Sequence, residues 1–120
     1  MPLTFHRTER IRLKRQIESL FREGQSVHAY PVRAVWLDIP YDGVPSRMMV
    51  SVPKRIFKRA VDRNLVKRRI RSAYRLHRDE IIVPEGQTRH YAFICTAKTM
   101  PEYAEIEAAV RAVMAKTAAR

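Results

Sequence analysis

The sequence has little of what many enzymes and membrane proteins depend on. Cys95 is the only cysteine among 120 residues, so neither an internal disulfide nor a cysteine-based zinc site can form. It lies in an apolar run, which favours a buried and inert thiol. No apolar run approaches the roughly 18 residues of a membrane span, and the first residues lack the apolar segment of a signal peptide. We therefore expect a cytoplasmic protein that does not bind a membrane.

Motifs for catalysis and metal binding are also missing. The sequence contains no nucleophile elbow, no phosphate-binding loop and no credible pair of catalytic carboxylates. Its four histidines are scattered and show no metal-ligand spacing. We therefore expect no catalytic residue, no metal site, no bound cofactor and no small-molecule substrate. If the chain takes part in a reaction, another molecule carries the chemistry.

Acidic residues are scarce relative to basic ones. The chain has 24 Lys and Arg against 12 Asp and Glu, which gives a net charge of +12 and a pI near 10.7. A hydrophobic fraction of 46% is that of a folded protein, and the length predicts one domain over residues 1–120, with an ordered core at about 9–116. So much positive charge indicates an anionic partner, either nucleic acid or a membrane surface, and of these two we expect nucleic acid.

The positive charge is concentrated in residues 53–78. Eleven of these residues are Lys or Arg, and Asp62 is the only acid. From Asp62 onward the stretch contains no Gly or Pro, so it predicts a helix that ends near Arg78. At 100° per residue, one arc of roughly 140° collects seven polar side chains: Arg63, Asn64, Lys67, Arg68, Arg71, Arg75 and Arg78. Arg69 is the exception, because it falls among the apolar positions.

Such a face is unfavourable for an isolated protein. Like charges four residues apart on a helix repel, and no acid interleaves to relieve them. A polyanion would supply the missing charge, since Arg binds phosphate with a planar fork and Lys with a point charge. A solvated basic face is the simpler alternative, but the charge density favours nucleic acid.

The rest of the chain predicts a small α+β domain in the order α-β-β-β-α-β-α. We expect helices at 9–23, at about 62–78 and from about 101 onward, and strands at 26–29, 32–39, 47–52 and 91–97. A turn at 40–45 and a loop at 79–89 separate these elements. The 91–97 strand is apolar on both faces and should be central in the sheet.

With the basic stretch placed after a strand, the sequence resembles the bacterial ribonuclease P protein component. That family carries Ser-Val-x-Lys-Lys followed by Arg-Asn-Arg-x-Lys-Arg-x-x-Arg-(Glu/Gln)-x-(Phe/Tyr)-Arg. The matching segments here are Ser-Val-Pro-Lys-Arg at 51–55, Arg-Asn-Leu-Val-Lys-Arg at 63–68 and Ile-Arg-Ser-Ala-Tyr-Arg at 70–75. The resemblance covers about residues 9–116.

The resemblance implies a fold like the second domain of ribosomal protein S5, with a left-handed βαβ crossover. It also implies a protein subunit of ribonuclease P. Such a subunit binds the catalytic RNA and the 5′ leader of precursor tRNA, and the RNA, with Mg²⁺, removes the leader by hydrolysis.

Site residues follow from the resemblance position by position. The expected RNA-binding set is Lys54, Arg55, Arg59, Arg63, Asn64, Lys67, Arg68, Arg71 and Arg75. The leader cleft maps to Ile17 and Phe21 on the first helix and to an aromatic on the sheet, assigned to Trp36 with the register open by one residue. Core packing is the simpler interpretation of Ile17 and Phe21.

Three positions depart from the family pattern. Leu65 replaces the third residue of Arg-Asn-Arg, so that arginine's contact is lost or shifted to Arg69. The 54–60 connection has Lys58-Arg59 instead of a Gly, and Ile17 replaces an aromatic that could stack on a leader base. Two other functions fit the charge: a ribosomal or assembly protein that binds structured RNA, and, more weakly, a DNA-binding regulator.

Overall fold

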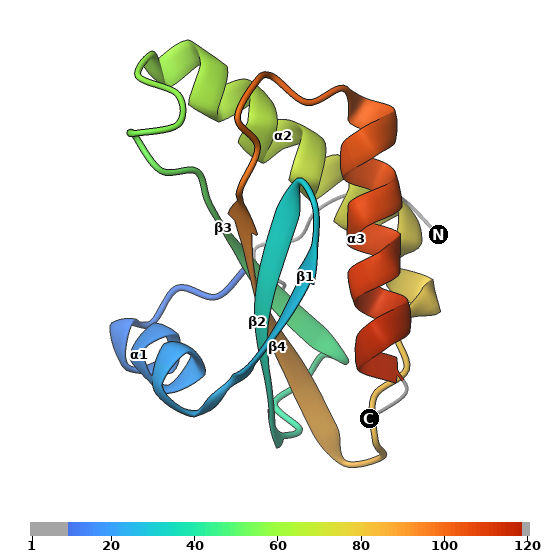
Figure 1. The fold of residues 1–120 in the computed structure, drawn as a ribbon. Helices are drawn as coiled ribbons and strands as arrows, with labels where there is room; N and C mark the ends of the chain where they lie inside the picture. The colour runs from blue at the N-terminus through green and yellow to red at the C-terminus, as the bar shows by residue number, and fades with distance from the viewer. Residues whose placement is uncertain (1–9, 119–120) are drawn as a thin grey trace.

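The computed structural model describes residues 10–118, which form a four-stranded sheet with helices on both faces (Figure 1). The elements are α1 (Lys14–Glu23), β1 (Gln25–Ala29), β2 (Val32–Pro40), β3 (Ser46–Ser51), α2 (Ala60–His77), the short 3-10 helix η2 (Arg78–Glu80), β4 (Gln87–Cys95) and α3 (Tyr103–Ala118). The predicted α+β class and element order are confirmed. None of the described helices is long and apolar enough to cross a membrane.

The sheet is mixed, with the strand order β1-β2-β4-β3. β1 and β2 are antiparallel, as are β2 and β4, whereas β3 and β4 are parallel neighbours. Because two parallel neighbours need a crossover, α2 connects β3 to β4 outside the sheet. β4 is an interior strand, as its two apolar faces predicted. The left-handed sense of the crossover stays an implication of the family resemblance.

The larger core lies between the sheet and the pair α2 and α3. β2 contributes Val32, Ala34 and Trp36, which share a face because side chains alternate along the strand. Tyr91 and Phe93 of β4 stack beside them, with ring centroids 5.2 Å apart. The last helix, α3, contributes Ile106, Val110, Val113 and Met114, which repeat at helical spacing. This packing fixes α2 on the sheet and leaves its opposite side free for other contacts.

A smaller core lies on the other face of the sheet, under α1. Its buried members are Ile11, Leu20, Val35 and Ala92. Gly24 permits the close approach of α1 to β2, since a Cβ there would lie 2.3 Å from the Leu20 carbonyl oxygen and 2.8 Å from Val35 Cγ1. Because α1 has only 10 residues, it covers only part of this face.

The predicted first helix is too long at its N-terminal end. Residue 9 lies outside the described residues, and the helix begins at Lys14 instead. Arg10 and Ile11 run beside β3, where the Ile11 N–H donates to the Met48 carbonyl at 3.0 Å. The free edge of β3 offers backbone partners that a helical periodicity in the sequence does not reveal.

The predicted 79–89 loop is also wrong at both ends. Residues 78–80 form η2, and β4 begins at Gln87 rather than Tyr91. The polar run from Gln87 to His90 does not look like a strand in the sequence. It is one because Asp38 pairs with Arg89, and Ile39 with Thr88, along the end of β2.

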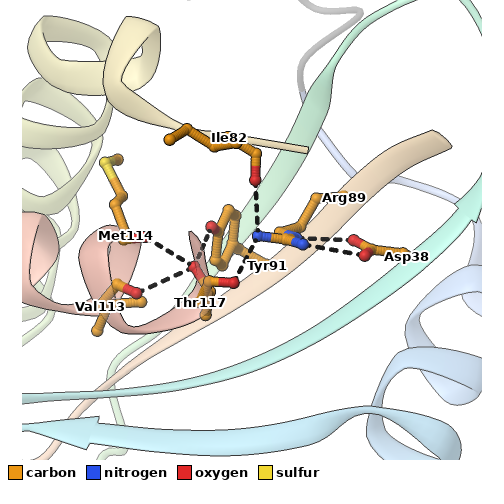
Figure 2. A network of polar contacts seen from close by, with 7 residues as sticks. All are labelled: Asp38, Ile82, Arg89, Tyr91, Val113, Met114 and Thr117. Atoms are coloured by element: carbon orange, nitrogen blue, oxygen red, sulfur yellow. Dashed lines mark hydrogen bonds and ion pairs between the residues drawn. The ribbon is translucent and has the colours of Figure 1, made fainter. Parts of the chain in front are cut away.

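Arg89 is the charged member of that polar run, and hydrogen bonds compensate its burial (Figure 2). Its side chain is 1% exposed, and its Nε and Nη2 donate to the Asp38 carboxylate at 2.7 and 3.0 Å. Nη1 donates to the carbonyls of Ile82 and Thr117 at 3.1 and 3.2 Å. Tyr91 adds a hydroxyl contact of 2.8 Å to Thr117. One guanidinium therefore joins β4, β2, the loop before β4 and the end of α3.

Candidate nucleic-acid interface

The α2 helix has one buried side and one charged side. Val66, Ile70, Ala73 and Tyr74 are its buried residues. On the other side Asn64 and Arg68 are exposed, while Arg63, Lys67, Arg71 and Arg75 are half-buried. The helix therefore presents the predicted basic residues together on a surface that the sheet and α3 do not cover.

The cations at the centre of this face are not neutralised by carboxylates of residues 10–118. Lys67, Arg68 and Arg71 form no ion pair with any carboxylate of residues 10–118. Burial, and then the nearby charge of Arg10, lower the pKa of the Arg71 guanidinium. Arg10 thus lies near α2, and the N-terminal segment beside β3 extends the basic surface.

Two arginines of the predicted set also hold the local structure. Arg63 Nη1 donates to the carbonyls of Phe57 and Lys58 at 2.9 and 2.8 Å, so it fixes the connection that precedes its own helix. Arg75 Nη2 donates to Ser72 Oγ at 3.3 Å. These contacts leave other guanidinium N–H groups for a ligand, because each guanidinium carries five donors.

The connection between β3 and α2 carries the remaining predicted residues. Lys54, Arg55 and Arg59 are all exposed, and Phe57 anchors the connection in the core at 9% exposure. A hollow of about 310 Å³ beside it is lined by Arg55, Ile56, Thr96, Ala97 and Lys98. Lys98 was missed by sequence reasoning because only the parallel pairing of β3 and β4 brings their C-terminal ends together.

Arg69, the predicted substitute for the arginine that Leu65 replaces, makes a structural contact. Its Nη1 donates to the Pro101 carbonyl at 2.7 Å, so the guanidinium ties α2 to the start of α3. This contact explains why a cation occupies an otherwise apolar side of α2. The basic face therefore lacks a cation at the position of Leu65.

The structure brings together two of the three residues predicted for a cleft. Phe21 is 44% exposed and Ile17 is half-buried, and the two lie one turn apart on α1. Trp36 points to the opposite face of the sheet, where it is 7% exposed and lies under the Arg89 guanidinium at 4.5 Å. The grouping of Trp36 with Ile17 and Phe21 is therefore wrong. Its neighbour Val35 occupies the α1 face, because side chains alternate along a strand.

Within the described part of the chain, no group of three or more His, Cys, Asp or Glu side chains could hold a metal ion. Cys95 is buried, and burial raises the pKa of its thiol. The arrangement can therefore bind phosphate and stack a base, but its described side chains form no evident catalytic constellation.

Comparison with known proteins agrees with this picture. The family model described as Ribonuclease P matches residues 5–118. A ribonuclease P protein component of Porphyromonas gingivalis is 34% identical over 116 residues, which cover 92% of this chain and 85% of that protein.

Solved structures show the same fold. The RNase P protein of Staphylococcus aureus matches with a TM-score of 0.72 and 20% identity, over 91% of this chain and 94% of that one. The RNase P protein of Thermotoga maritima matches with a TM-score of 0.72 and 22% identity, over 90% of this chain and 96% of that one. These structures show the fold, and the family model with the 34% identical relative shows that the chain belongs to the ribonuclease P protein family, whose members are components of an RNA-containing endoribonuclease of tRNA processing.

Proposed function

We propose that this protein is the subunit of ribonuclease P that docks on the catalytic RNA through α2 and the connection before it. The observation that carries the proposal is the row Lys67, Arg68 and Arg71, which has no carboxylate partner within residues 10–118. RNA phosphates supply the missing charge, and the release of condensed counterions contributes to the affinity. Asn64 is exposed on the same face and can both donate to and accept from a base or the RNA backbone.

The RNA performs the hydrolysis with Mg²⁺, and the protein contributes binding and positioning in the cytoplasm. The exposed Phe21 and its neighbour Ile17 form the surface that receives the 5′ leader of precursor tRNA. A flat ring at 44% exposure can stack on an unpaired base whatever its sequence. Ile17 offers apolar contact without stacking, so this protein has a smaller stacking platform than one with two aromatics.

Reconstitution tests the proposal directly. The protein is combined with its cognate ribonuclease P RNA and precursor tRNA at low Mg²⁺, and cleavage at the mature 5′ end is measured. We expect the protein to raise cleavage above that of the RNA alone, because its cations replace part of the charge screening that Mg²⁺ otherwise provides.

Two outcomes would contradict it. An unchanged cleavage rate would mean that the protein is not the functional partner of this RNA, and the alternative of a structured-RNA-binding assembly protein would then gain support. Cleavage by nuclease-treated protein without added RNA would contradict catalysis by the RNA subunit.

A further inference from the structure

The α1 helix divides its face of the sheet into two regions. Leu20 is fully buried beneath the helix, and Ile17 and Phe21 lie on one flank. Gln16 and Ser19 lie on the other flank, since Ser19 and Phe21 are about 160° apart around the helix axis. The second flank thus faces a different part of the sheet from the one proposed for the leader.

A pocket opens on this second flank. It has a volume of about 220 Å³ and is lined by Arg15, Gln16, Ser19, Leu37, Ile39 and His90, which we call the His90 pocket. Its size is below the roughly 300–1,000 Å³ of pockets that hold drug-sized ligands, and it suits a single planar ring. Leu37 and Ile39 give it an apolar wall, and Gln16 and Ser19 place hydrogen-bonding groups at its rim.

His90 is the unexplained group of this pocket. The residue is 1% exposed, and its Nε2 is buried without a hydrogen-bond partner within residues 10–118. Burial lowers the pKa of the imidazole, which favours the neutral ring. An unpartnered buried nitrogen costs free energy unless a ligand or a water satisfies it. In the sheet, His90 pairs with Leu37 of β2 on one side and with Arg47 of β3 on the other. Its ring therefore lies on the sheet side of the pocket.

A second hollow adjoins this pocket and shares Gln16 with it. It has a volume of about 250 Å³ and is lined by Arg10, Arg12, Leu13, Gln16, Asp42 and Arg47, which we call the Arg47 pocket. Asp42, its only carboxylate, is paired with Arg47 at 3.2 Å. Arg12 and Arg15 have no carboxylate partner within residues 10–118.

Arg10, which lines the Arg47 pocket, connects that pocket to the basic face of α2. It runs beside β3, and its charge acts on Arg71. A strand of RNA that follows α2 would therefore meet a continuous series of cations leading to the His90 pocket. The flank with Phe21 has no such connection to α2 through Arg10.

We propose that the joined His90 and Arg47 pockets bind one unpaired nucleotide of the catalytic RNA, with its base in the first and its phosphate at the arginines of the second. The proposal rests on the proposed function. The base packs on Leu37 and Ile39, while its polar edge meets Gln16, Ser19 and the unpartnered His90 nitrogen.

Site-directed crosslinking identifies the occupant. A Ser19→Cys variant carries one accessible thiol, because Cys95 is 1% exposed. An aryl-azide label on that thiol is photoactivated in the holoenzyme with precursor tRNA bound. Phe21→Cys on the opposite flank and Glu18→Cys on the solvent side of α1 are the matched controls. We expect Ser19→Cys to crosslink to the catalytic RNA and Phe21→Cys to the leader.

Each other result overturns the proposal. Crosslinking of Ser19→Cys to the leader would assign the pocket to the precursor, and yields no higher than those of Glu18→Cys would mean that no RNA enters it. The wild-type protein must first raise cleavage in the reconstitution assay. Failure at that step contradicts the proposed function, whereas failure of the crosslink alone contradicts only this inference.

Affinity measurements give a second test. Ser19→Phe fills the pocket from its rim, so binding to the catalytic RNA should weaken roughly three- to tenfold, whereas Glu18→Phe should cause no loss. His90→Leu removes the unpartnered nitrogen and should also weaken binding while the protein stays folded. Unchanged affinity in both variants, with melting temperatures at or above that of the wild type, would make His90 an ordinary core residue and overturn the proposal.

Discussion

The basic side chains of α2 differ in the contacts that they make. Arg68 is exposed and lacks a carboxylate partner within residues 10–118, whereas Arg69, the next residue, donates to the Pro101 carbonyl. Adjacent positions on a helix point about 100° apart, so the Arg68 side chain faces solvent while Arg69 faces the start of α3. This pair can therefore test RNA binding and stability separately within one turn.

Arg68→Ala should weaken binding to the catalytic RNA and flatten its salt dependence. Each phosphate contact adds roughly 0.7–0.9 to the slope of log K against log salt, so the slope should fall by about that amount. Filter-binding or fluorescence titrations between low and moderate salt measure it.

Arg69→Ala is the matched control for that experiment. It should leave the slope unchanged and lower the free energy of unfolding, because it removes a charge-assisted hydrogen bond worth about 1 kcal/mol or more. Equal slopes for Arg68→Ala and the wild type would place Arg68 away from the RNA.

Phe21→Ala should weaken the binding of precursor tRNA with a long leader by about 1–3 kcal/mol, since it removes a stacking surface. Binding of precursor with a leader of one nucleotide, and assembly with the catalytic RNA, should stay the same. Because 44% of Phe21 is exposed, the loss of stability should be well below the roughly 3–5 kcal/mol of a buried phenylalanine. Unfolding of the variant would instead favour the core interpretation.

At the scale of elements, α2 is held in place at its C-terminal end by a cluster of charges shared with α3. His77 lies between two carboxylates, with Nδ1 2.8 Å from Glu80 and Nε2 2.7 Å from Glu107. Glu80 also accepts from Arg111 of α3 at 3.1 Å. Both ring nitrogens can donate only when the imidazole is protonated, so the cluster is complete in the imidazolium form.

This cluster should make stability depend on pH. The hydrogen bond to Glu107 is the largest cause that raises the pKa of His77. A raised folded-state pKa stabilises the protein fully below the unfolded value of about 6.5, and the contribution is lost as pH rises through the folded pKa. The free energy of unfolding of the wild type minus that of His77→Gln should therefore fall across this window.

Chemical denaturation at several pH values measures that difference. Subtracting the variant removes the contribution of His90, whose lowered pKa acts in the opposite direction. A difference that does not change with pH would show that His77 is not protonated between the two glutamates.

At the scale of the whole molecule, the Arg89 network of Figure 2 joins segments that are far apart in the sequence. Asp38 comes from β2, Ile82 from the loop before β4 and Thr117 from the last turn of α3. Asp38→Ala should therefore destabilise the fold by about 3–5 kcal/mol, because it leaves the guanidinium buried without its counter-charge. Urea denaturation monitored by Trp36 fluorescence measures this loss.

A double variant provides the control for that prediction. Asp38→Leu with Arg89→Met removes both charges, so it should cost less than Asp38→Ala alone. A double variant that is less stable than the single one would mean that Arg89 acts mainly through its bonds to the Ile82 and Thr117 carbonyls.

The secondary structure was predicted well wherever local periodicity decided it. Val66, Ile70 and Ala73 of α2, the apolar stripe of α3 and the alternating residues of β2 lie in the core, because each set repeats with the period of its element. The prediction failed where a distant partner decides the structure. Residues 10 and 11 join the edge of β3, and the polar start of β4 is a strand through its pairing with β2.

The sequence by itself determined the order and type of the main elements, the basic face of α2 and, through the segments at 51–55 and 63–75, the family. These are local properties, written in the order and spacing of neighbouring residues. Only the tertiary structure decided that Trp36 lies on the face away from α1, that Arg69 supports α3, and that Lys98 lies beside Arg55. It alone placed His90 in a pocket opposite the Phe21 flank. These relations depend on strand register and helix docking, which bring together residues that no sequence window contains.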